Sequence, residues 1–363
     1  MTEKDFVPIQ NLDYLTEGIV GWKAPSNIAL VKYWGKMPNQ IPANPSISFT
    51  LDACATKTSL KFKKLEKKDS EFSFDFLFEG MPKETFRPKI STFFERVSSY
   101  LPFLKEYHFE IDSSNSFPHS SGIASSASGM SALALCLLEI ERRSTPGMTP
   151  DHFTKKASFL ARLGSGSACR SIEGDLIQWG KTASIKESSD LFGITYPFEV
   201  HLNFKNYHDT ILLVHKGQKP VSSTVGHGLM KDHPFAKNRF KQAHQNLEAL
   251  QSIFRNGDLD AFVKIVESEA LTLHAMMMTS QPYFMLMLPN TLEIIKRIWA
   301  FRRETNMPIC FTLDAGANVH VLYPASEKEK CIQFIQDELV AYCEHGQYIC
   351  DRIGNGAKQF SPI

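Results

Sequence analysis

Hydrophobic and polar residues alternate along the first part of the chain with the period of two that is typical of half-buried strands. Residues 18–62 show this pattern most clearly, and Ser46 to Leu51 alternates strictly. The same period on both sides of a charged turn predicts a pair of neighbouring strands. After them, a stretch with the period of an amphipathic helix precedes a further stretch with the period of a strand. We therefore expect the strand pair at 56–63 and 71–78, a helix at 88–101 and a strand at 107–111.

Beyond residue 205 the pattern changes to that of amphipathic helices. The polar stretch before this point predicts a domain boundary, and we expect domains at 1–205 and 206–363. The order of elements in the second half, a strand, helices, a hairpin, a helix and a last strand, is typical of an α+β sandwich. The predicted helices are 235–255, 258–278, 289–304 and 326–343, and the predicted strands are 210–215, 309–313, 319–323 and 347–353.

One stretch in the first half, Phe117 to Gly129, is rich in small hydroxyl-bearing residues, with five serines and two glycines. It is followed by Met130 to Leu138, which is apolar on nearly every side and so predicts a buried helix. Free backbone N–H groups at a helix N-terminus bind anions, and small residues let a phosphate approach them. The stretch is therefore either a phosphate-binding loop or an ordinary serine-rich helix cap, and by itself it favours neither.

The composition is that of an ordinary globular protein, with 22% charged and 43% hydrophobic residues. The net charge of +1 gives no reason to expect nucleic acid or a membrane surface as a partner, so a strongly anionic ligand must be met by local cations. The seven cysteines form no Cys-x-x-Cys pair, which argues against zinc ribbons and fits a reducing compartment. Because we find no signal-peptide pattern and no apolar run long enough to cross a bilayer, we expect a cytoplasmic protein.

Four charged residues stand where they could meet a ligand. Lys32 and Lys36 flank a Tyr-Trp-Gly segment and would suit phosphate groups, although two solvated lysines would give the same pattern. Arg170 ends the serine-rich turn Gly164 to Arg170, where a guanidinium is either an anion ligand or a structural pin. Asp314 follows an apolar strand and precedes two small residues, so it is either a general base or a turn-capping residue.

Several stretches together resemble one family, the diphosphomevalonate decarboxylases of the GHMP small-molecule kinase superfamily. Four blocks that span most of the chain carry the resemblance: Ala24 to Lys36, Phe117 to Gly129, Gly164 to Arg170 and Phe311 to Gly316. The resemblance implies a two-domain α+β fold, the GHMP kinase fold. Its N-terminal domain is ribosomal protein S5 domain 2-like, its C-terminal domain is a ferredoxin-like α/β sandwich, and the active site lies in the cleft between them.

The resemblance also implies a reaction, the ATP-dependent conversion of mevalonate 5-diphosphate to isopentenyl diphosphate, with release of ADP, phosphate and CO2. Mg²⁺ would accompany ATP, and a homodimer is implied. A kinase or a monophosphate decarboxylase of the same superfamily stays an alternative, as does an inactive protein that binds ATP or an isoprenoid intermediate. The presence of Lys36, Arg170 and Asp314 together favours decarboxylation.

Roles for individual residues follow from the same resemblance. Asp314 would act as the base near the tertiary 3-hydroxyl group, Arg170 would hold the substrate carboxylate, and Lys36 would face the phosphates. The expected substrate contacts are Tyr33, Lys36, Ser165, Ser167, Arg170 and Thr224. The expected ATP contacts are Pro118, Ser120, Ser121, Gly122, Ile123, Ala124, Ser125 and Ser126. Mg²⁺ would lie near the ATP phosphates, with Ser125 or Ser126 as a candidate ligand.

Overall fold

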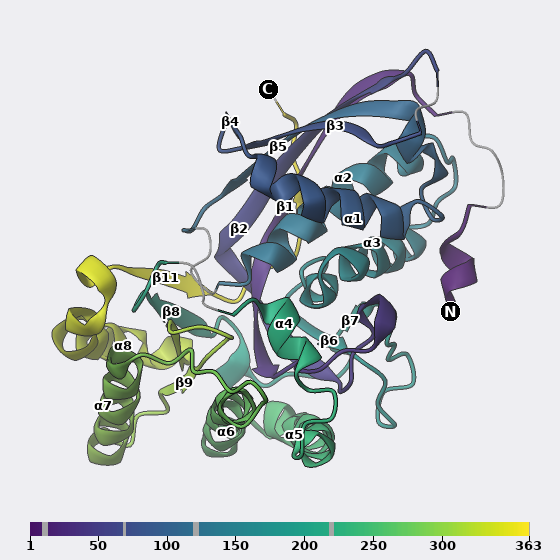
Figure 1. The fold of residues 1–363 in the computed structure, drawn as a ribbon. Coiled ribbons are helices and arrows are strands. Elements are labelled where there is room, and N and C mark those ends of the chain that lie inside the picture. The colour runs from purple at the N-terminus through teal and green to yellow at the C-terminus, as the bar shows by residue number, and fades with distance from the viewer. Residues whose placement is uncertain (9–13, 68–69, 119–122, 218–220, 363) are drawn as a thin grey trace.

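In the computed structural model, the described residues fold around two sheets, one of eight strands and one of four (Figure 1). The structure describes residues 1–363 except 9–13, 68–69, 119–122, 218–220 and 363. The larger sheet has the order β12-β1-β2-β5-β3-β4, with β6 paired to β2 and β7 to β6. Its strands are β1 (Glu17–Val31), β2 (Ser46–Lys64), β3 (Ser73–Phe78), β4 (Met81–Pro82), β5 (Tyr107–Asn115), β6 (Leu176–Trp179), β7 (Gly193–Thr195) and β12 (Lys358–Gln359).

The β-rich region predicted at 18–62 is confirmed as the antiparallel pair β1–β2, but the predicted pairing of 56–63 with 71–78 is wrong. β5 lies between β2 and β3, antiparallel to β2 and parallel to β3. Parallel neighbours need a crossover connection, and helix α1 (Arg87–Val97) lies in the connection between β3 and β5. Alternation along a strand indicates which face is buried, but it does not indicate which strand lies beside it.

Helices α1, α2 (Ser125–Arg143) and α3 (Pro150–Gly164) lie on one side of the larger sheet (Figure 1). The predicted buried helix is confirmed as α2, which packs against β1 and β2 and buries every residue from Met130 to Leu138. The stretch Thr149-Pro150-Asp151 is a typical helix start, and helix α3 begins there. The Thr149 hydroxyl caps it by accepting a hydrogen bond from the His152 N–H at 3.2 Å.

The smaller sheet is antiparallel in the order β11-β8-β10-β9, and helices of the second half pack around it (Figure 1). The predicted hairpin is confirmed as β9–β10, whereas the helix predicted at 326–343 is α8 followed by a π turn and a 3-10 turn. The strands are β8 (His208–Leu212), β9 (Cys310–Thr312), β10 (Val319–Tyr323) and β11 (Tyr348–Arg352). The helices are α4 (Ser223–Gly228), α5 (Ala236–Asn256), α6 (Leu259–Met278), α7 (Pro289–Thr305) and α8 (Lys328–Phe334).

The two sheets share part of their hydrophobic core. One buried cluster joins residues of β1, such as Ile28, to residues of β8, such as Ile211. Polar contacts also link the two sheets, since the Asp351 carboxylate accepts the backbone N–H groups of residues 52–54 at 2.7 to 3.0 Å. The domain boundary near residue 205 therefore stays a prediction. No helix in the described part of the chain is long and apolar enough to cross a membrane.

Candidate active site

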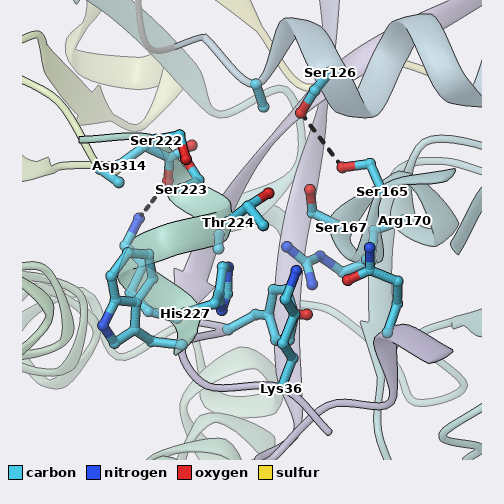
Figure 2. A pocket seen from close by; sticks show the side chains of 18 of the residues that line it. Lys36, Ser126, Ser165, Ser167, Arg170, Ser222, Ser223, Thr224, His227 and Asp314 are labelled. Carbon is cyan, nitrogen blue, oxygen red and sulfur yellow. Dashed lines mark hydrogen bonds and ion pairs between the residues drawn. The ribbon is translucent and has the colours of Figure 1, made fainter. Parts of the chain in front are cut away.

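A cavity of about 420 Å³ lies where the end of β1, the N-terminus of α2, the turn after α3 and helix α4 meet the turn after β9 (Figure 2). Pro118 and Ile123 are not among its lining residues, and Ser120, Ser121 and Gly122 lie outside the described residues. The fold thus brings most of the predicted site together from distant parts of the sequence. The predicted residues that line the cavity are Tyr33, Lys36, Ala124, Ser125, Ser126, Ser165, Ser167, Arg170, Thr224 and Asp314.

Asp314 reaches the cavity from the turn after β9, and its carboxylate pairs with the lysine that directly follows β1. Lys32 Nζ lies 3.2 Å from Asp314 Oδ1, and the Lys32 side chain is only 2% exposed. Burial lowers the pKa of Lys32, although the negative charge of Asp314 opposes the shift. The interpretation of Lys32 as a solvated lysine is therefore wrong. His274 Nε2 donates a hydrogen bond to the backbone carbonyl of Asp314 at 3.1 Å, which helps to fix the turn.

A buried ion pair fixes the backbone at Lys32. Arg239 Nη2 of α5 and Glu269 Oε2 of α6 lie 2.5 Å apart, and both side chains are fully buried. Glu269 accepts the Lys32 N–H at 2.8 Å, while Arg239 donates to the Lys32 carbonyl at 3.1 Å. Because both backbone groups of Lys32 are bound, helices from the second half of the chain determine where its ammonium group lies.

Arg170 reaches the cavity from the turn after α3 and is almost fully buried. Its Nε and Nη1 donate to the hydroxyls of Ser48 and Ser46 at 2.6 and 2.7 Å. Among the described residues, no ion pair engages Arg170 and no hydrogen bond engages its Nη2. Burial lowers the pKa of Arg170, but the ordinary pKa of arginine is so high that the group stays charged. The two serines therefore orient a cation that keeps one nitrogen available to a ligand.

The N-terminus of α2 borders the cavity on another side. Ala124 occupies the cap position with a φ of 45°, and no described side chain caps the helix. Ser125 and Ser126 lie in the first turn, and Ser126 Oγ lies 3.3 Å from Ser165 Oγ across the cavity wall (Figure 2). The described residues thus favour the phosphate-binding interpretation over the serine cap, because both serines lie inside the helix and line the cavity.

Aromatic rings close the cavity beside α4. The His227 ring lies against those of Tyr33 and Trp34, with centroids 4.3 and 4.5 Å away. The Tyr33 hydroxyl is buried without a hydrogen-bond partner among the described residues, and burial raises the pKa of Tyr33. A Cβ atom at Gly166 would come within 2.6 Å of that hydroxyl. Glycine at 166 therefore allows the serine-rich turn to approach Tyr33 closely.

Several residues of the lining were not among the sequence-based predictions of site residues. They include Lys89, Ser222, Ser223 and His227. A signal for His227 was available, because it follows Thr224 by three positions and residues so spaced share one face of a helix. Lys89 has no such signal, since α1 is remote in sequence from every motif of the site.

The described lining is strongly positive. Its charged side chains are four cations, Lys32, Lys36, Lys89 and Arg170, and one carboxylate, Asp314. The pKa of Lys36 is lowered by burial and, to a smaller extent, by the charge of Arg96. This local excess of cations in a chain of net charge +1 suits an anionic ligand. No three His, Cys, Asp or Glu side chains in the described part of the chain are grouped so that they could hold a metal ion.

The fold is mixed α+β and GHMP kinase-like. Its cavity joins a helix N-terminus, buried cations and a carboxylate, and this combination is typical of an enzyme that binds phosphorylated small molecules. Residues 24–190 match the family model of the diphosphomevalonate decarboxylase-like N-terminal domain. Residues 210–358 match that of the mevalonate 5-diphosphate decarboxylase C-terminal domain. The chain therefore belongs to the diphosphomevalonate decarboxylase family, as its sequence motifs predicted.

Individual relatives agree with this assignment. A mevalonate diphosphate decarboxylase from Legionella pneumophila is 30% identical, with a TM-score of 0.76 over 92% of this chain and 100% of that one. The structure of MDDEF in complex with MVAPP, AMPPCP and magnesium is 28% identical, with a TM-score of 0.80 over 95% of this chain and 99% of that one. The diphosphomevalonate decarboxylase of Saccharomyces cerevisiae is 29% identical, and the match covers 86% of this chain and 79% of that protein. The predicted fold class is confirmed, while the roles of individual residues stay predictions.

Proposed function

We propose that this chain catalyses the ATP-dependent decarboxylation of mevalonate 5-diphosphate to isopentenyl diphosphate, the step of the mevalonate pathway that releases ADP, phosphate and CO2. The observation that carries the proposal is the position of Asp314 in one cavity with Arg170, Lys36 and the N-terminus of α2. Membership of the decarboxylase family supports it, as does the complex of a relative with MVAPP, AMPPCP and magnesium.

Asp314 acts in the first step, in which the 3-hydroxyl oxygen of the substrate attacks the γ-phosphorus of ATP. A tertiary alcohol is a poor nucleophile, so Asp314 accepts the hydroxyl proton as the O–P bond forms and ADP leaves. The Lys32 ammonium group, 3.2 Å away, holds the carboxylate in place. Lys36 and the N-terminus of α2 offset the charge of the phosphates.

Arg170 acts in the second step, in which the C3–O bond breaks and the phosphate leaves with the bonding electrons. Positive charge develops at C3, and the electrons of the bond to the carboxylate carbon form the double bond as CO2 departs. Arg170 holds the substrate carboxylate through Nη2. Because Ser46 and Ser48 bind its other nitrogens, the guanidinium keeps that carboxylate aligned for cleavage.

Mg²⁺ supplies charge neutralisation at the phosphates when it is bound with ATP. The described site fits this ion, because Mg²⁺ takes oxygen ligands, keeps several waters and needs few protein groups. The hydroxyls of Ser125 and Ser126 line the cavity at the N-terminus of α2 and are the candidate ligands. The remaining candidate substrate contacts are Tyr33, Ser165, Ser167 and Thr224.

Product analysis tests the proposal. Purified protein is incubated with ATP, Mg²⁺ and either mevalonate 5-phosphate or mevalonate 5-diphosphate, and products are identified by mass spectrometry and CO2 release. Isopentenyl diphosphate, ADP, phosphate and CO2 in equal amounts are expected from the diphosphate. A stable phosphorylated product without CO2 would identify a kinase instead. Turnover of only the monophosphate would identify a monophosphate decarboxylase, and ligand binding without phosphate release would identify an inactive binding protein.

We also infer that the protein is a cytoplasmic homodimer whose partners are small molecules. All seven cysteines are free and six of them are buried, which supports a reducing compartment. The dimer is supported by the family resemblance alone. Light scattering during size-exclusion chromatography should give twice the 41.0 kDa mass of the chain, and cell fractionation should place the protein in the cytosol.

A further inference from the structure

His227 has a defined position at the cavity although no motif led to it. The ring lies against those of Tyr33 and Trp34, with centroids 4.3 and 4.5 Å away. The preceding residue, Gly226, lets α4 approach the indole, because a Cβ atom there would come within 2.6 Å of the Trp34 ring. Packing against these two rings therefore restricts the orientation of the imidazole.

A backbone hydrogen bond determines which ring nitrogen of His227 carries the proton. The Gly35 N–H donates to His227 Nδ1 at 3.0 Å, so Nδ1 must offer its lone pair. Gly35 has a φ of +100°, which favours glycine and fixes the direction of this N–H. A neutral imidazole that accepts at Nδ1 carries its proton on Nε2. Nε2 is therefore a donor, and no described residue accepts from it.

The imidazole is neutral as well as oriented. Burial, together with the positive charges of Lys36 and Arg170, lowers the pKa of His227 to about 3. A further positive charge near these cations would be repelled, whereas a neutral N–H is tolerated. The cavity thus offers an anion one uncharged donor in addition to its cations.

We propose that His227 is a substrate-binding residue that donates a hydrogen bond from Nε2 to an anionic oxygen of the substrate. The inference rests on the proposed function for the identity of the substrate, and it adds a contact to the same site. The substrate offers such oxygens on its phosphates and on its carboxylate. Both groups are acceptors of the same chemistry, and the experiment below distinguishes them.

Two amide variants separate the two nitrogens of His227. His227→Asn places an amide oxygen near the position of Nδ1 and keeps an acceptor for the Gly35 N–H, but it has no donor at the position of Nε2. His227→Gln places an amide N–H₂ near Nε2. Because His227→Asn loses a hydrogen bond to a charged group, its KM should rise about tenfold, with kcat little changed. His227→Gln should bind nearly as the wild type, and the exposed His244→Leu serves as the control.

A measurement on the unmodified protein guards against misfolded variants. With ¹⁵N-labelled histidine, the His227 Nδ1 should resonate as an unprotonated nitrogen and Nε2 as a protonated one. Saturating inorganic diphosphate should shift the Nε2 resonance if the contact is to phosphate, and mevalonate should shift it if the contact is to the carboxylate. A shift with either probe supports the inference, and an Nε2 resonance that neither probe moves overturns it.

The two proposals can fail separately. Wild-type turnover with an unaltered KM in His227→Asn would overturn the role of His227 and leave the reaction in place. An enzyme without turnover, in which diphosphate still shifts the Nε2 resonance, would overturn the reaction and leave the contact in place. If substrate binding were weakened equally in both amide variants and neither probe moved the Nε2 resonance, His227 would have a purely structural role and the inference would be overturned.

Discussion

Lys32 and Lys36 stand close together in the sequence, but the fold gives them different environments. Lys32 is buried and lies 3.2 Å from Asp314, whereas Lys36 is only partly buried and makes no ion pair among the described residues. Burial lowers the pKa of each ammonium group. A buried lysine paired with a carboxylate is suited to positioning that carboxylate, while a lysine at the cavity surface can follow a mobile phosphate.

At the scale of single residues, Asp314→Asn should reduce kcat by at least about 100-fold, because the amide cannot accept the proton of the 3-hydroxyl group. Binding of an ATP analogue should stay nearly unchanged, since the carboxylate is not needed to hold the nucleotide. Steady-state kinetics and calorimetric titration measure the two effects. Asp337→Asn, at an exposed site, is the matched control, and a near-normal rate for Asp314→Asn would remove Asp314 from the mechanism.

The pKa of His227 predicts a pH dependence of stability. The pKa is about 3 in the folded chain and about 6.5 in the unfolded one. Between these values the unfolded chain binds a proton that the folded chain excludes. The contribution of neutral His227 is therefore fully present above about pH 6.5 and is lost as the pH falls toward 3.

Urea unfolding at pH 7 and pH 4 measures this contribution. Wild-type protein should lose at least about 1 kcal/mol more unfolding free energy between the two pH values than His227→Leu does. The exposed His244→Leu should behave as the wild type. Equal losses in all three proteins would show that His227 titrates normally in the folded chain.

At the scale of elements, the end of β1 is held by α5 and α6 rather than by its own neighbours in sequence. Arg239 and Glu269 form a fully buried pair, and both bind the backbone of Lys32. Asn246 of α5 adds a donor to Glu269 at 2.6 Å, so the buried carboxylate is well satisfied. A buried charge left without its partner is costly, and this makes the pair a sensitive point of the fold.

Arg239→Met should therefore lower the unfolding free energy by about 3–5 kcal/mol, because Glu269 stays buried without its cation. The double variant Arg239→Met/Glu269→Gln removes the unpaired charge and keeps an oxygen for the Lys32 N–H. It should recover a large part of the lost stability in urea unfolding. If the single and double variants were equally stable, the buried charge of Glu269 would not be the cause of the loss.

At the scale of the whole molecule, the hydrophobic core continues from the larger sheet into the second half of the chain. Ile28, Leu30 and other residues of the first half share a buried cluster with residues of β8, α5 and α6. The cavity is built from both halves as well, since Asp314 and Thr224 meet Lys36 and Arg170. Neither half encloses the site or this part of the core by itself.

Separate expression of residues 1–205 and 206–363 should accordingly give two fragments that unfold without a sharp transition, because each exposes apolar surface that the other covers. The whole chain should unfold in urea with coincident transitions by fluorescence and circular dichroism. Fragments that each unfold cooperatively, with the stability of the intact chain, would show two independent domains joined at residue 205.

Features that depend on neighbours along the chain could be predicted from the amino-acid pattern. Periodicity located the buried helix α2 and the hairpin β9–β10, and capping located the start of α3 at Thr149. The geometry of these elements needs only contacts within a turn or between adjacent strands. The motifs at 24–36, 164–170 and 311–316 also led to the family, because they combine residue types that a random chain rarely places together.

Which of these residues meet depends on the fold. β5 lies between β2 and β3, although alternation alone favoured pairing the outer two. Lys32 is buried at Asp314 across 282 positions of sequence, and Gly35 orients His227 across 192. Such contacts depend on the packing of whole helices and sheets, and that packing leaves no local pattern in the chain. The motifs therefore led to the expected reaction through the family that they resemble, whereas the protonation state of His227 and the burial of Lys32 required the fold.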